Sequence, residues 1–140
     1  MRIDAPTGVR QLPELVAEAL DHCDAAQLRG GASRAARMAI ARVGLVDHRV
    51  DAALAALESG QIGDGPAREA LFRLVEQLDS SSSRSAHQTA RACSALWSAL
   101  DADPRVAAAV ATHEAHAVLG DWEPLIELWT WRSSLRGAML

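Results

Sequence analysis

The segment His-Glu-Ala-His at 113–116 holds the residue types best suited to chemistry in this sequence. On a helix, residues i and i+3 share a face, so both imidazoles could reach one metal ion or one substrate. The zinc-protease motif needs histidines at i and i+4, and the di-metal carboxylate motif needs Glu-x-x-His; neither occurs here. His113 also continues an apolar stripe with Val106 and Val110. The alternative interpretation is therefore a histidine at the edge of the core that donates to a backbone or carboxylate group.

Nucleophilic and phosphate chemistry find little support. No Gly-x-Ser-x-Gly elbow is present, and neither Cys23 nor Cys93 has a histidine beside it in the sequence, although such a pair can also form in space. The glycines of segment 60–65 lack the Lys-Ser/Thr of a P-loop. The two isolated cysteines are interpreted as buried, reduced core thiols. No metal, cofactor or catalytic residue is predicted, which favours a protein that is not an enzyme.

Arginines are concentrated between residues 29 and 49. This segment contains five arginines and one aspartate, which gives it a formal net charge of +4. Residues 101–128 carry six acidic side chains against one arginine, a balance of −5. These stretches are either solvated helix faces that neutralise each other or a bipolar surface that steers a charged partner. A phosphate or carboxylate could be held by the arginines of the second expected helix and its neighbour, and this candidate anion site comprises Arg34, Arg37, Arg42 and Arg49. The net charge of −4 argues against a nucleic-acid partner. DNA binding through a helix-turn-helix in the 29–49 region is a third alternative.

The elements that position these residues are expected to be helices. Of 140 residues, 29 are Ala and 17 are Leu, all 14 basic residues are Arg, and 4% are aromatic. Strong helix formers therefore dominate, and no segment alternates with period two for long enough to form a strand. Caps, prolines and glycines predict the following helices: Pro13 to Leu28 ended by Gly30-Gly31, Ser33 to Gly44, a third capped by Asp47, a fourth opened by Pro66, Ser85 to Leu100, Pro104 to Leu119, and a last helix capped by Asp121.

The last helix carries apolar residues on two sides. Trp122, Ile126 and Trp129 form one stripe, and Trp131 lies about 160° around the helix from Trp129. Such a helix is either central in a small bundle or buried within an assembly. The predicted interface comprises Trp122, Leu128, Trp129, Trp131 and Leu135. A second possibility is an interhelical pocket lined by Trp97, His113, His116 and Trp122.

Two stretches resemble known helical families. Asp103-Pro104-Arg105-Val106, followed by an alanine-rich run and Leu119-Gly120-Asp121, resembles a HEAT-like α-solenoid unit, and segment 46–54 echoes its start. The two starts lie 56 residues apart, so no periodic array is present. The 46–54 stretch, continued by Gly60-Gln61-Ile62, is similar to small helical proteins of the bacterial immunity type. Either resemblance implies a helical, non-catalytic protein that binds another protein.

The sequence thus predicts an all-α protein: one domain over residues 1–140, built as a bundle or short solenoid-like stack of six to seven antiparallel helices. Residues 1–9 are expected to be disordered and 79–84 to form a flexible serine-rich loop. The arginine-for-lysine composition is typical of a GC-rich bacterial genome. No secretory signal or membrane span is recognised, so a cytoplasmic location is expected. The predicted function is a protein-binding module (adaptor, regulator or immunity-type partner) that binds another protein or itself. The alternative is a small helical enzyme or ligand-binding protein that uses the Trp/His pocket.

Overall fold

The computed structural model describes the backbone of residues 12–139 and the side chains of residues 12–133. Within this range the chain is all-α and contains no strand, which confirms the predicted fold class. The expectation for residues 1–9 falls outside the described residues. The helices are α2 (Glu14–Asp21), α3 (Ala25–Val43), α4 (His48–Ser59), α5 (Pro66–Asp79), α6 (Arg84–Ala99), α7 (Pro104–Leu119) and α8 (Glu123–Met139).

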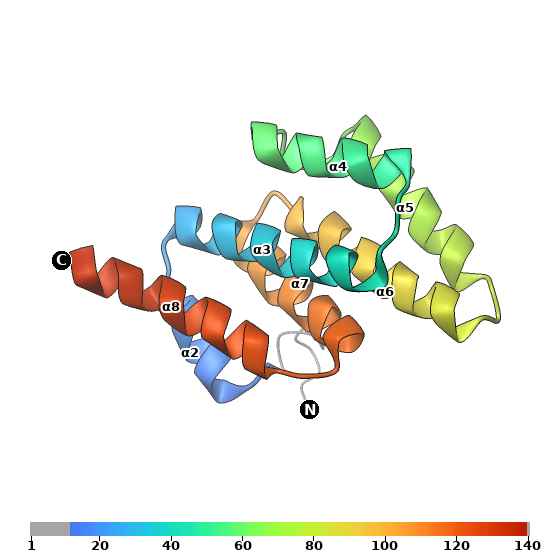
Figure 1. Cartoon of the computed structure of the whole chain (residues 1–140). Coiled ribbons are helices and arrows are strands. Elements are labelled where there is room, and N and C mark those ends of the chain that lie inside the picture. Colours follow the sequence, from blue (N-terminus) through green and yellow to red (C-terminus); the bar gives the residue numbers. More distant parts are fainter. Residues whose placement is uncertain (1–11, 140) are drawn as a thin grey trace, which may run out of the picture.

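Helices α3, α6 and α7 form the centre of the molecule and pack most extensively on one another. Their contacting faces are made largely of alanine, and the small side chains let the helix backbones approach closely. Fully buried alanines on these three helices are Ala32, Ala35, Ala36, Ala39, Ala90, Ala92, Ala95, Ala99, Ala107, Ala108, Ala109, Ala111 and Ala115. The α4–α5 hairpin covers one side of this centre and the pair α2 and α8 covers the other (Figure 1).

Most helix ends follow the caps in the sequence. The Asp103 carboxylate accepts hydrogen bonds from the backbone N–H groups of Arg105 and Val106, and Pro104 occupies the first turn of α7. Gly120 ends α7 in the left-handed conformation, with φ of 73°. The serine-rich connection spans residues 80–83, and Ser83 caps α6.

The predicted break at Gly30-Gly31 is wrong. The first helix ends at Asp21 instead, and α3 begins at Ala25 with Asp24 as its N-cap. The Asp24 carboxylate accepts from the backbone N–H of Gln27, and the Gln27 side chain accepts from the backbone N–H of Asp24. This reciprocal capping box starts α3 nine residues earlier than the predicted Ser33 cap, so both glycines lie inside the helix. The sequence rule failed because Gly31 serves a packing contact with α8, described below.

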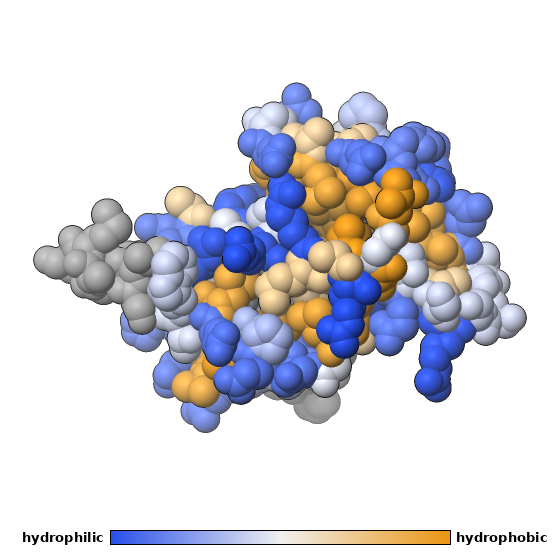
Figure 2. Space-filling view, in the orientation of Figure 1, coloured by the Kyte–Doolittle hydropathy of each residue, from blue (hydrophilic) through white to orange (hydrophobic). Residues whose placement is uncertain are grey.

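Two residues expected in the core are more exposed than predicted. Leu15, placed in the inward stripe of the first helix, is 55% exposed on α2, and Cys23 is half-buried. Figure 2 shows apolar side chains between charged ones on the face where α8 meets α3. That face contains the residues from which the candidate site is built.

Candidate functional site: the groove between α3 and α8

Trp129 belongs to the core. Its side chain is fully buried, and the indole N–H donates a hydrogen bond of 2.9 Å to the hydroxyl of Thr112 on α7. The Thr112 hydroxyl in turn donates to the carbonyl of Ala108 at 2.6 Å, so the buried polar atoms form a satisfied chain. The placement of Trp129 in the predicted interface is therefore wrong, because an indole with no exposed surface cannot contact a partner.

Trp131, two residues later, lies on the opposite side of α8 and is 60% exposed. Leu128, on the same side, is half-buried and packs against the edge of the core. Trp122 is half-buried at the start of the helix, and the side chain of Leu135 lies outside the described residues. The two tryptophan sides of α8 thus differ: one is core and the other faces outward.

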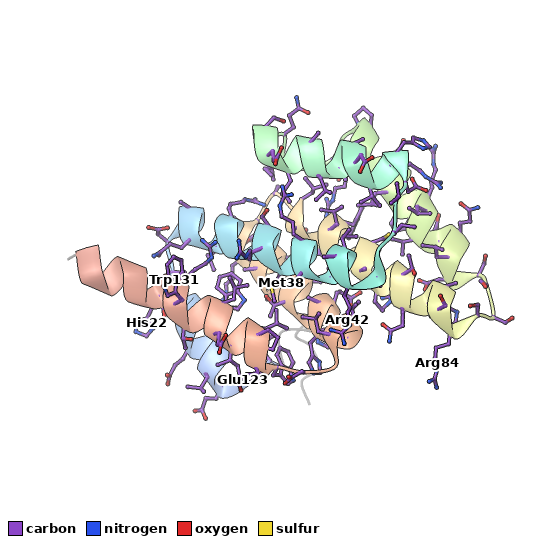
Figure 3. All side chains as sticks on the ribbon, viewed as in Figure 1. His22, Met38, Arg42, Arg84, Glu123 and Trp131 are labelled. Atoms are coloured by element: carbon purple, nitrogen blue, oxygen red, sulfur yellow. The ribbon has the colours of Figure 1, made fainter. Side chains whose placement is uncertain are left out.

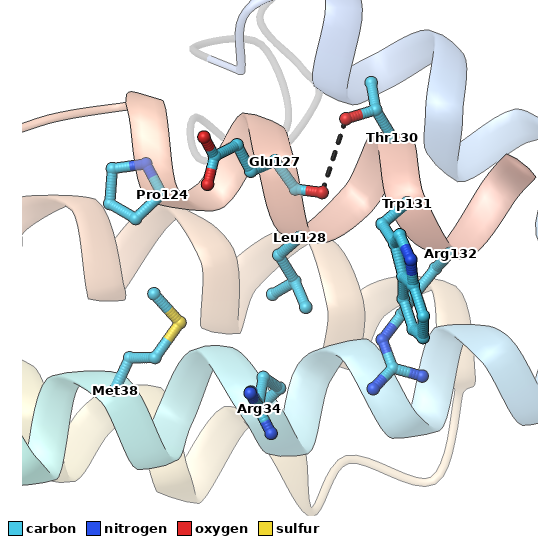
Figure 4. A pocket seen from close by; sticks show the side chains of 8 residues that line it. All are labelled: Arg34, Met38, Pro124, Glu127, Leu128, Thr130, Trp131 and Arg132. Carbon is cyan, nitrogen blue, oxygen red and sulfur yellow. Dashed lines mark hydrogen bonds between the residues drawn. The ribbon is translucent and has the colours of Figure 1, made fainter.

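An open groove of about 890 Å³ runs between α8 and α3 beside Trp131. Helix α8 packs more extensively on α2 than on α3, which leaves this space along the α3 side. Figure 4 shows Trp131 and Arg132 toward one end of the groove and Pro124 and Met38 toward the other. The residues that line it are Arg34, Met38, Pro124, Glu127, Leu128, Thr130, Trp131 and Arg132.

The groove combines an apolar floor with charged rims. Leu128 and Met38 supply apolar surface, while Arg34 on α3 and Glu127 on α8 are both exposed. The Arg132 side chain is half-buried. Its Nε atom is buried and has no hydrogen-bond partner among the described residues. The Arg132 side chain lines the groove, so its guanidinium group can donate to an incoming carboxylate or carbonyl.

The four arginines of the predicted anion site do not converge. Arg37 pairs with Glu58 on α4 at 3.5 Å, and Arg49 pairs with Asp47 at 2.9 Å, so these two guanidinium groups are occupied within the fold. Arg34 and Arg42 are exposed and lie eight residues apart in the sequence of α3. Figure 3 labels Arg42 and Met38, which precedes it by four residues. Of the four arginines predicted to form the anion site, only Arg34 lines the groove.

Asp47 gives this pairing a pH dependence. The Arg49 guanidinium donates to both Asp47 carboxylate oxygens, at 3.0 and 2.9 Å, and holds the pKa of that carboxyl near 2 instead of 3.8. A carboxyl whose pKa is lower in the folded state stabilises the fold at pH values above its unfolded-state pKa. This contribution to stability is lost as the pH falls from about 4 to about 2. We expect Asp47→Asn to lower the free energy of unfolding by about 1 kcal/mol at pH 7 and to have a much smaller effect at pH 2.

Urea denaturation at pH 7, 4.5 and 3 measures the difference in the free energy of unfolding between wild type and Asp47→Asn, which should become smaller as the pH falls. Asparagine caps a helix as well as aspartate does, so the substitution removes the charge and keeps the cap of α4. Asp24→Asn is the matched control, because Asp24 caps α3 through Gln27 and forms no ion pair within the described residues. An effect of Asp47→Asn that is constant with pH would contradict the prediction.

The residues of the predicted Trp/His pocket fall into two clusters. The Arg68 guanidinium carbon lies over the Trp97 ring, 3.9 Å from the ring centroid. The backbone carbonyl of Trp97 accepts a hydrogen bond from Arg68 Nε–H at 3.0 Å. The His116 ring instead stacks on Trp122 with centroids 3.9 Å apart and an interplanar angle of 8°. Each aromatic ring is thus engaged with a different neighbour.

The histidine pair lies at the α7–α8 end of the molecule. Burial, together with the nearby His113, lowers the pKa of His116, and Asp121 opposes this shift. His113 is half-buried, and its buried Nδ1 has no hydrogen-bond partner among the described residues, unlike the satisfied core-edge histidine that the sequence predicts. Within the described part of the chain, no three His, Cys, Asp or Glu side chains are arranged to hold a metal ion.

Cys93 is the buried thiol that the sequence predicts. It is fully buried in α6, and burial raises the pKa of its thiol to about 11. A thiol with this pKa is protonated near neutral pH and is therefore a poor nucleophile.

Sequence periodicity identified Trp131 and Leu128, and the arginine cluster identified Arg34, but Met38, Glu127 and Arg132 were missed as site residues. Met38 lies one helical turn beyond Arg34, so the i, i+4 spacing was an available signal. Along residues 12–139, no helix has the length and apolar character needed to cross a bilayer. No protein-family model matches the chain, and no curated protein or solved structure matches it.

Proposed function

We propose that this chain is a non-enzymatic protein-binding module whose binding surface is the groove between α3 and α8. The observation that carries the proposal is the exposure of Trp131, at 60%, on the rim of an open groove with an apolar floor. Tryptophan and arginine are the residues most enriched among those that dominate binding energy at protein interfaces. Trp131 and Arg132 are adjacent in this groove.

The pattern around Trp131 supports a protein partner. Leu128 and Met38 form an apolar centre, and Arg34, Glu127 and Arg132 form a polar rim, which is the arrangement found at protein interfaces. A small-molecule site usually encloses most of its ligand, whereas this groove is largely open to solvent. The role fits an adaptor, a regulator or an immunity-type partner, as the family resemblances imply.

The test compares the proteins that three immobilised versions of the chain retain from a lysate of the source organism. Trp131→Ser removes the rim indole, and Leu15→Ser is the matched control, because Leu15 is similarly exposed but lies on α2. We expect wild type and Leu15→Ser to retain a common protein that Trp131→Ser loses. With that protein purified, Trp131→Ser should raise the dissociation constant by about 30-fold or more. Identical retention by all three versions would overturn the proposal.

A further inference from the structure

The outward side of α8 carries a heptad-like spacing. Leu128 and Trp131 are three residues apart, Leu135 follows after four, and Ala138 after three more. A 3-4-3 spacing places all four positions on one seam of a helix, as the a and d positions of a coiled coil. The α8 backbone is helical through Met139, so the seam is continuous in the structure. For residues 135 and 138 the inference uses only their register positions.

This seam is incompletely covered by the rest of the molecule. At its start Leu128 is half-buried, and one turn later Trp131 is 60% exposed. Toward its C-terminal end α8 extends past the N-terminal end of α3 (Figure 1). An apolar seam on a helix that leaves the body of the protein has the geometry of a helix-pairing surface.

The charges beside the seam favour one kind of partner helix. With Leu128 at position a, Glu127 occupies position g and Arg132 the following position e, five residues later. In a parallel pair of helices, position g of one helix faces the next position e of the other. Two copies of α8 would therefore form two Glu127–Arg132 ion pairs. In an antiparallel pair position g faces position g, so Glu127 would not meet Arg132. Glu127 is exposed, and Arg132 is half-buried at the wall of the groove.

We infer that the occupant of this surface is a second copy of the chain, with the two α8 helices parallel and in register about a two-fold axis. Leu128 and Trp131 of each copy pack across the axis, and Glu127 of each copy pairs with Arg132 of the other. Such an interface is isologous and closes at a dimer, because the same patch is used on both sides. The inference rests on the proposed binding role of the groove and specifies its partner.

Sedimentation velocity across a range of concentrations tests the dimer, and charge exchange tests the ion pairs. Glu127→Arg places like charges at both pairs, as does Arg132→Glu, and each should raise the dimer dissociation constant about tenfold at low salt. An equimolar mixture of the two variants restores opposite charges at both pairs and should recover dimers. A wild-type chain that stays monomeric would overturn the inference, as would variants that dimerise equally well alone and mixed.

Because Arg132 is half-buried, a substitution there can also disturb folding, and cross-linking supplies an independent test. Leu135→Cys lies on the seam and should form an intermolecular disulfide on mild oxidation. Ser133→Cys, on the side of α8 that faces α2, should stay at the background of the wild-type cysteines. Equal cross-linking at both positions, or none at position 135, would overturn the parallel register. A monomeric wild type would contradict the dimer but not the proposed binding function. The binding function is contradicted only if Trp131→Ser retains the same proteins as wild type.

Discussion

Replacing Trp129 with alanine is expected to lower the free energy of unfolding by about 3–5 kcal/mol, whereas Trp131→Ala should change it by less than about 0.5 kcal/mol. The two residues share a helix and a side-chain type and differ in burial. Trp129 is fully buried and donates to Thr112, while Trp131 is 60% exposed. Deleting the buried indole leaves a cavity between α3, α7 and α8 and removes the hydrogen bond that the Thr112 hydroxyl accepts. Deleting the exposed indole removes mainly solvated surface.

Urea denaturation followed by circular dichroism measures both variants under one set of conditions. Thr112→Val, which keeps the shape of the side chain but removes the hydroxyl, separates the hydrogen bond from the packing. It leaves the indole N–H buried without a partner and should cost about 1–3 kcal/mol, less than Trp129→Ala. Equal losses for Trp129→Ala and Trp131→Ala would show that both sides of α8 are core, and the binding surface proposed for Trp131 would then have no basis.

Helix positions were largely predictable because their ends are set by local chemistry. The aspartate cap and proline at 103–104 start α7, and Gly120 ends it, as the sequence alone indicates. The same local rules failed at Gly30-Gly31, because a glycine pair is equally typical of a helix end and of a site where two helices approach closely. Only the indole of Trp129, ninety-eight residues away in sequence, decides between these meanings.

Only some residues of the candidate site were predictable from the sequence, and its geometry was not. The spacing of the tryptophans on α8 shows that two sides of the helix are apolar, yet it does not state which side meets α7. Likewise, the arginines between 29 and 49 look equivalent in the sequence, but Arg37 and Arg49 find carboxylates at Glu58 and Asp47. Such outcomes depend on which helices become neighbours, and that is fixed by packing over the whole chain.

Gly31 shows how tightly this packing is set. A Cβ atom built on Gly31 would lie 2.1 Å from Cη2 of Trp129, whereas one on Gly30 would meet only the guanidinium end of Arg132, at 2.7 Å. Alanine at either position adds about 1 kcal/mol of helix propensity. At position 31 the overlap with a pinned indole outweighs that gain, and we expect Gly31→Ala to lower the free energy of unfolding by about 2–3 kcal/mol. Gly30→Ala should be neutral or slightly stabilising, because the flexible arginine can move aside.

A double substitution tests whether the indole is the cause. The atoms nearest to Gly31 belong to the six-membered ring at the far edge of the Trp129 side chain, which phenylalanine does not reach. In a Trp129→Phe background, Gly31→Ala should therefore change sign and raise the free energy of unfolding by up to about 1 kcal/mol, since only the propensity gain remains. Urea denaturation of the four proteins of this cycle gives the coupling directly. A loss that persists in the phenylalanine background would mean that Gly31 is required by the α3 backbone itself, and α8 would not be the element that fixes it.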